Sequence, residues 1–185
     1  MKSVIRGAVV GLAVALCAGS VQAQGLSFGV GGGAVIPTGS MADLNSTGWS
    51  AMAVARLKPP VAPLGLQVDA FYSRLGLEGG VDGHSRIIGG TANAVFAFPG
   101  AGAARPYLLG GVGVYNGKVT IDGFGSSDAE TKFGLNAGAG FDFGLGKASL
   151  FADARFHAIL KGGVDASTFE ETTAYMIPVT VGLRF

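Results

Sequence analysis

The sequence predicts an all-β protein, an eight-stranded antiparallel up-and-down barrel that closes on itself and crosses a membrane. First, apolar side chains occupy every second position of the last eleven residues, as in a strand with one apolar face. Second, the mean hydropathy is high, yet no apolar run after residue 23 is long enough for a spanning helix. Alternating strands of a membrane barrel produce this combination. Third, similar alternating segments recur along the chain, and the connections between them alternate in length.

The final strand has a regular apolar alternation. Its apolar positions are Tyr175, Ile177, Val179, Val181, Leu183 and Phe185. The residues between them, such as Thr180 and Arg184, are mostly small or polar. In its alternation, length and closing aromatic, this segment resembles the C-terminal strand of bacterial outer-membrane barrels. The resemblance implies that the barrel assembly machinery reads this strand as its assembly signal.

The first 23 residues have the pattern of a secretory signal. Lys2 and Arg6 precede an apolar core, and Val21-Gln22-Ala23 places tolerated residues before the expected cleavage point. A permanent membrane helix would need an apolar run of about twenty residues. A lipoprotein signal would have a small residue before Cys17, where this chain has leucine. We therefore expect a cleaved signal peptide over 1–23 and a single barrel domain over 24–185.

The composition of the mature chain excludes several classes of protein. Its 162 residues contain no cysteine, which excludes disulfides and thiolate chemistry. Eleven basic and twelve acidic residues form no basic stripe, so nucleic-acid binding is not expected. Two histidines without thiols predict no metal site, and the glycine runs lack the Lys-Ser/Thr of a phosphate loop. We therefore expect no cofactor and no metal.

The first four predicted strands are 26–36, 49–58, 64–75 and 86–98. Each alternates apolar residues with small or polar ones, as Leu66 and Val68 alternate with Gln67 and Asp69. Pro59-Pro60 ends the second strand, because proline cannot donate to the ladder. The many glycines suit strands that curve around a narrow interior.

The last four predicted strands are 106–116, 132–143, 150–158 and 175–185. The strand over 106–116 is apolar at both parities, so the pattern leaves its register open. The strand over 132–143 alternates strictly between residues such as Phe133 and residues such as Asn136. A turn at Gly144-Leu145-Gly146 leads into the strand that carries Asp153 and Arg155.

Connections and charges support this assignment. The predicted connections are long at 37–48, 76–85, 117–131 and 160–173 and short between them, as in barrels with short periplasmic turns and longer external loops. Nine of the twelve acidic residues fall in the long segments: Asp43, Glu78, Asp82, Asp122, Asp128, Glu130, Asp165, Glu170 and Glu171. The other three, Asp69, Asp142 and Asp153, take inward positions. A register shifted by one residue would turn them toward lipid.

The chain resembles the family of small eight-stranded outer-membrane barrels that includes the membrane domain of outer membrane protein A. The segments that carry the resemblance are 89–94, 105–111, 133–140, 151–155 and the Phe185 terminus. The resemblance implies an integral, monomeric, porin-like protein of the bacterial outer membrane, exported through the periplasm and in contact with outer-membrane lipid and lipopolysaccharide. Surface proteins, narrow pores, adhesins and lipid-modifying enzymes share this fold, so the fold does not give the function.

One set of polar residues is predicted to face the interior. Its members are Arg56, Asp69, Lys132, Asn136, Asp142, Asp153, Arg155, His157 and Arg184. Such a set could form a charged constriction in a pore, a catalytic cluster, or a network of ion pairs that closes the lumen. Eight strands leave an interior that side chains nearly fill, and buried charges must pair, so we favour the closed network.

The sequence favours a non-enzymatic function. An outer-membrane deacylase pairs a histidine with a serine two residues later, but here Ile159 follows His157 at that position. His84-Ser85 lies beside a loop, where a palmitoyl transferase places polar residues, and a polar loop is the simpler interpretation. We expect a structural or surface protein with acidic, glycine-rich external loops and a side-chain-plugged lumen. The alternatives are a narrow pore for small solutes and a lipid A-modifying enzyme.

Overall fold

The computed structural model describes residues 25–59, 63–80, 82–99, 104–160 and 174–185. The predicted signal peptide lies outside these residues, as do the acidic residues of the last long connection, Asp165, Glu170 and Glu171. Within the described residues, no helix is long and apolar enough to cross a membrane.

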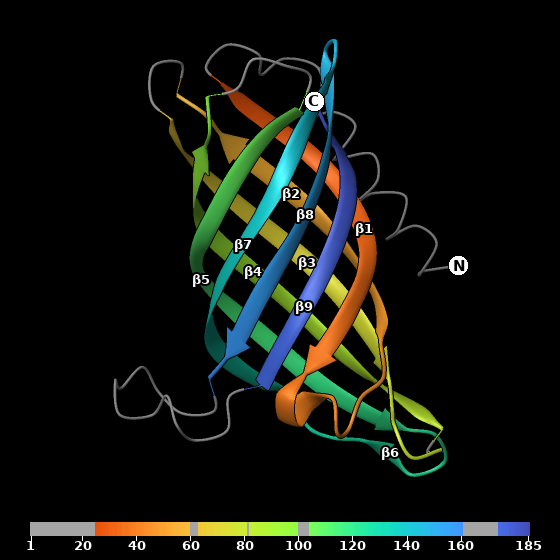
Figure 1. The fold of residues 1–185 in the computed structure, drawn as a ribbon. Coiled ribbons are helices and arrows are strands. Elements are labelled where there is room, and N and C mark those ends of the chain that lie inside the picture. The colour runs from red at the N-terminus through yellow and green to blue at the C-terminus, as the bar shows by residue number, and fades with distance from the viewer. Residues whose placement is uncertain (1–24, 60–62, 81, 100–103, 161–173) are drawn as a thin grey trace, which may run out of the picture.

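The described chain is a closed antiparallel barrel (Figure 1). Its strands are β1 (Leu26–Thr38), β2 (Gly48–Leu57), β3 (Leu64–Gly76), β4 (Gly83–Ala97), β5 (Ala104–Ile121), β6 (Gly125–Ser126), β7 (Glu130–Leu145), β8 (Ala148–Ile159) and β9 (Ala174–Arg184). Eight of these strands form the ring, and the two-residue β6 pairs with β5 alone. A short 3-10 turn (Gly39–Met41) follows β1. The predicted all-β, eight-stranded barrel is confirmed.

The ring closes where β1 meets β9, the orange and blue strands that lie side by side in Figure 1. Gly29 lies opposite Arg184 in this pairing. Beyond it, the backbone N–H of Phe28 donates to the carbonyl of Phe185 at 2.9 Å, and the N–H of Phe185 donates back at 2.8 Å. This pairing leaves the ring without an open edge at the β1–β9 seam, which a spanning sheet requires because lipid offers no hydrogen bonds.

The side chains of the strands point alternately outward and inward, as the alternation of the sequence predicted. On β3, Leu66 is 60% exposed and Val68 is 59% exposed, whereas Gln67 and Asp69 are each 1% exposed. The structure also settles the register of β5, where Tyr107, Leu109 and Tyr115 are buried inside and Leu108 and Val112 face outward. Apolar residues therefore cover most of the outside, and the interior holds both polar and apolar side chains.

Two predicted connections are shorter than expected. β4 begins at Gly83 and β5 continues to Ile121, which lies opposite Gly83, so pairing extends into both predicted loops, 76–85 and 117–131. The β-branched residues from Val119 to Ile121 favour this extension. The predicted turn at 144–146 is a two-residue turn at Gly146-Lys147, where Gly146 has a φ of 74°. Glycine adopts that conformation without steric cost.

The barrel has two different ends. At one end, which we call the short-turn end, lie Leu26, Leu57, Leu64, Leu145 and Ala148, together with the connections β2–β3, β4–β5 and β7–β8. At the other, the loop end, lie Thr38, Gly48, Gly76, Gly83 and Ile121. β6 marks the loop end in Figure 1.

Paired aromatic rings occur on the outer surface near both ends. Trp49 and Tyr72 have ring centroids 5.4 Å apart near the loop end. Phe96 and Phe98 lie 5.1 Å apart near the short-turn end. Aromatic girdles of this kind mark the two membrane–water interfaces of spanning barrels.

Candidate functional site

The interior contains a polar network centred on Arg155 of β8. Its Nε and Nη2 donate to the two carboxylate oxygens of Asp153, both at 3.0 Å, and its Nη1 donates to Asp69 Oδ2 at 2.8 Å. Arg155 and Asp153 are each 4% exposed. One guanidinium therefore bridges two buried carboxylates, and its planar donors suit this geometry.

Asp69 of β3 collects most of the other hydrogen bonds. Its Oδ2 accepts from Thr91 Oγ1 at 3.1 Å and from Asn93 Nδ2 at 2.8 Å, in addition to Arg155. Its Oδ1 accepts from Gln67 Nε2 at 2.7 Å. A buried carboxylate is stable only when its oxygens are satisfied in this way.

A second ionic group lies closer to the short-turn end. Asp142 of β7 accepts from Arg56 Nη1 at 2.9 Å and from Arg184 Nη1 at 2.7 Å. Gln67 joins the two groups, because its Oε1 accepts from Arg56 Nε at 2.6 Å while its Nε2 donates to Asp69. The polar network is thus one connected chain from Arg184 to Arg155.

Two of the ion pairs cross the full width of the barrel. Asp69 is on β3 and Arg155 on β8, and three strands separate β3 from β8 in either direction around the ring. The same separation holds for Arg56 on β2 and Asp142 on β7. Side chains of diametrically opposite strands therefore meet within the lumen.

Glycines on the inner face of β7 make room for this arrangement. Gly140 lies opposite Tyr107 on one side and Asp153 on the other, and the Tyr107 hydroxyl passes over it to donate to Asp153 Oδ2 at 2.8 Å. A Cβ added at Gly140 would lie 2.7 Å from Tyr107 Cζ and 2.6 Å from Asp153 Cβ. The absence of a side chain at Gly140 allows β5 to reach β8 across β7.

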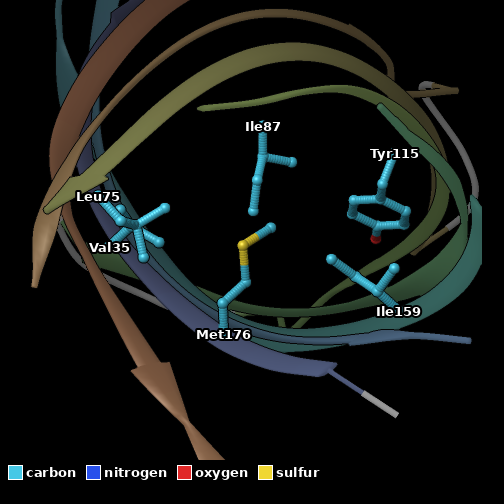
Figure 2. Packing of buried hydrophobic residues seen from close by; sticks show 6 residues of the cluster. All are labelled: Val35, Leu75, Ile87, Tyr115, Ile159 and Met176. Atoms are coloured by element: carbon cyan, nitrogen blue, oxygen red, sulfur yellow. The ribbon is translucent and has the colours of Figure 1, made fainter. Parts of the chain in front are cut away.

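An apolar cluster occupies the interior toward the loop end. It consists of Val35, Leu75, Ile87, Tyr115, Ile159 and Met176. These residues come from six strands, and Figure 2 shows their side chains projecting inward from around the barrel, with Met176 extending toward Ile87. Val35, Leu75 and Met176 are fully buried. Along the barrel axis, this apolar layer lies between the polar network and the loop end.

The structure brings six of the predicted interior residues together: Arg56, Asp69, Asp142, Asp153, Arg155 and Arg184. Three others do not join them. Lys132 lies near the loop end, where its Nζ is 3.0 Å from Glu130 Oε2. His157 lies between the polar network and the apolar cluster, with its Nδ1 2.8 Å from the Tyr115 hydroxyl. Asn136 is buried, and its amide has no partner among the described residues.

Gln67, Thr91, Asn93 and Tyr107 complete the network, although the sequence did not single them out as members. Gln67 has the same parity as Asp69 on β3, and Thr91 and Asn93 have the inward parity of β4, so the alternation of the sequence was the available signal. Tyr107 belongs to β5, whose two faces are both apolar in sequence, and no pattern distinguished it.

The charged groups of this arrangement are paired with one another. Every carboxylate of the network accepts from at least one arginine, and the ring of His157 packs against Phe71 at a centroid distance of 5.7 Å. Among the described residues, no group of three or more His, Cys, Asp or Glu is placed to hold a metal ion.

A closed ring with apolar residues outside and bonded polar residues inside defines a membrane-spanning β-barrel. The family model for the outer membrane protein beta-barrel domain matches residues 9–185. The chain belongs to this family and is an integral protein of the bacterial outer membrane.

Solved structures share the fold. Neisserial surface protein A is 18% identical, with a TM-score of 0.68 over 87% of this chain and 96% of that one. The attachment invasion locus protein Ail of Yersinia pestis is 21% identical, with a TM-score of 0.55 over 88% and 99% of the two chains. The N-terminal barrel domain of Pseudomonas aeruginosa OprF is 16% identical, with a TM-score of 0.51 over 88% and 98%. No curated protein sequence matches this chain.

Proposed function

We propose that this protein is a non-enzymatic structural or surface component of the outer membrane with a lumen closed by side chains. The observation that carries the proposal is the pair of ionic contacts between opposite strands, Arg155 with Asp69 and Arg56 with Asp142. A solute moving along the axis would have to break these contacts and also displace the apolar cluster around Met176. Closure of the ring within one chain supports a monomer.

The interior geometry does not favour the lipid A-modifying enzyme. Such an enzyme acts on a lipid outside the barrel and needs an acid or base on the outer surface. The acidic residues of the described strands, Asp69, Glu130, Asp142 and Asp153, all occupy inward positions of the alternation. His157 is 2% exposed and faces the interior. His84 takes an outward position of β4, but its Nδ1 lies 3.2 Å from Arg74 Nη2 and the adjacent Ser85 is buried inside the barrel.

Single-channel conductance in a planar bilayer tests the closed lumen. The protein is first shown to be folded by its faster gel migration without heating. We expect a silent bilayer, under conditions in which a large porin added as a control gives open events. Steady and reproducible openings of this protein would contradict the proposal and support the narrow pore for small solutes.

We also propose that cations on the outer surface contact lipopolysaccharide at the loop end. Arg74, Arg86 and Lys118 lie opposite one another on β3, β4 and β5, at outward positions of the alternation. The phosphates of lipid A complement such a row. Lipopolysaccharide should therefore raise the melting temperature of the unmodified protein more than that of Arg74→Gln/Arg86→Gln/Lys118→Gln. Equal increases would contradict this contact.

We further propose that β9 carries the signal for the barrel assembly machinery. Phe185 is 47% exposed on the outer surface, and its backbone completes the β1–β9 seam. Phe185→Ala keeps this backbone pairing, so we expect near-normal stability after refolding in detergent. In cells, the amount of folded protein in the outer membrane should fall several-fold. Comparable amounts of variant and unmodified protein in the membrane would contradict the proposed signal, and Phe98→Ala is the control for loss of an outer aromatic.

A further inference from the structure

The short-turn end of the lumen opens into a cavity of about 400 Å³. Arg56, Asp142 and Arg184 form its floor, where the polar network ends, and Lys58, Arg105 and Lys147 also line it. Among the charged side chains of the described residues that line the cavity, five are cationic and one is acidic.

The side chains of the floor carry a net positive charge. Arg56 and Arg184 are each 5% exposed, and the ion pairs of both in the described residues go to the single carboxylate of Asp142. Two buried guanidinium groups therefore share one negative charge. A buried charge without a counter-charge is costly.

The two arginines also have donor nitrogens without hydrogen-bond acceptors among the described residues. Arg56 Nη2, Arg184 Nε and Arg184 Nη2 are buried and have no acceptor among the described residues. Each guanidinium is held by an aromatic ring, Arg56 over Tyr107 at 4.3 Å and Arg184 over Phe151 at 4.9 Å. The donors are thus fixed in position before any ligand arrives, which lowers the entropic cost of binding.

The rim adds further positive charge. Lys58, Arg105 and Lys147 are exposed, so their side chains attract an anion toward the floor. Residues 60–62 and 100–103, which belong to the connections β2–β3 and β4–β5, lie outside the described residues and contain no ionisable side chains in the sequence.

We infer that this cavity is a binding site for a small phosphate-bearing anion. A phosphate supplies the missing negative charge and several acceptor oxygens, which match two adjacent arginines better than a single carboxylate does. The short-turn end faces the periplasm in barrels of this kind. The phosphate group belongs either to a free periplasmic anion or to the head group of an anionic phospholipid at that surface.

Calorimetric titration with inorganic pyrophosphate tests this site. The folded protein is placed in phosphatidylcholine nanodiscs at low ionic strength, where no anionic lipid competes. We expect saturable binding. Arg184→Lys keeps the charge but removes the Nη2 donor, and it should weaken binding by roughly tenfold, the usual effect of one charge-assisted hydrogen bond.

A second variant keeps the test informative if Arg184→Lys does not fold. Lys58→Gln/Arg105→Gln/Lys147→Gln changes exposed residues alone and should also weaken binding by roughly tenfold. The matched control is Lys132→Gln, which removes a cation at the loop end outside both proposed phosphate sites, and this variant should bind as the unmodified protein does. Absence of pyrophosphate binding, or an equal loss of binding in Lys132→Gln and in the triple variant of the short-turn end, would overturn the inference.

Replacing part of the phosphatidylcholine with phosphatidylglycerol distinguishes the two sources of phosphate. If pyrophosphate binding weakens, the lipid head group competes for the cavity and is its natural ligand. If binding is unchanged, a free anion is the ligand. Both outcomes support the site, and neither depends on whether the lumen conducts.

Discussion

Replacement of Arg155 by methionine is expected to lower the free energy of unfolding by about 3–5 kcal/mol, the cost of breaking a buried ion pair. The substitution removes three hydrogen bonds and leaves the carboxylates of Asp69 and Asp153 facing each other in the interior. Their repulsion and lost pairing are the main sources of the cost. Urea unfolding in detergent micelles measures the change.

Two control variants separate the loss of ion pairs at Arg155 from the loss of side-chain packing. Arg155→Met combined with Asp69→Asn and Asp153→Asn removes all three charges, so it should recover a large part of the lost stability. Lys147→Met removes an exposed cation from the β7–β8 turn and should leave stability unchanged. If Arg155→Met alone were as stable as the unmodified protein, the polar network would not contribute to holding the barrel together.

Gly140→Ala is expected to destabilise the barrel at the upper end of the range for over-packing, about 3 kcal/mol, or to prevent refolding. The added methyl group would lie 2.6 Å from the carbonyl oxygen of Ala152 and 2.7 Å from Tyr107 Cζ. The backbone of β8 cannot yield without breaking its pairing with β7. Tyr107 would therefore move and lose its hydrogen bond to Asp153.

Gly110→Ala is the matched control for this substitution. Gly110 lies at an outward position of β5, where an added Cβ would meet no atom closer than 3.6 Å. We expect this variant to refold with nearly unchanged stability in the same urea titration. If the two alanine variants were equally stable, the inner face of β7 would tolerate a side chain in place of Gly140, which would contradict this prediction.

The alternation of residues was sufficient to predict the fold and the facing of the strands. A period of two assigns each residue to one face, and lipid outside with polar groups inside leaves one consistent register. Alternation could not assign the inward face of β5, because both of its faces are apolar in sequence. Its register follows instead from its pairing with β4 and β7. The strand extensions near Ile121 were missed because they lie where composition resembles a loop.

The candidate site was less predictable than the fold. Parity places Lys132 and His157 on the same face as Arg155, but it says nothing of height along the barrel axis. Contacts across the lumen depend on how the strands are staggered around the ring. That stagger brings Arg155 to Asp69 and leaves Lys132 beside Glu130. The sequence could therefore supply the members of the network but not their partners.

Hydrogen exchange at the Arg155 side chain tests the closed lumen most directly. Nitrogen-15 NMR of the protein in micelles resolves the arginine Nε–H groups, and Arg155→Lys assigns the resonance. Because Arg155 Nε donates to Asp153 inside the barrel, we expect slow exchange with water, whereas the exposed Arg105 should exchange fast. Equally fast exchange at Arg155 and Arg105 would mean that water reaches the centre of the lumen, and it would contradict the account.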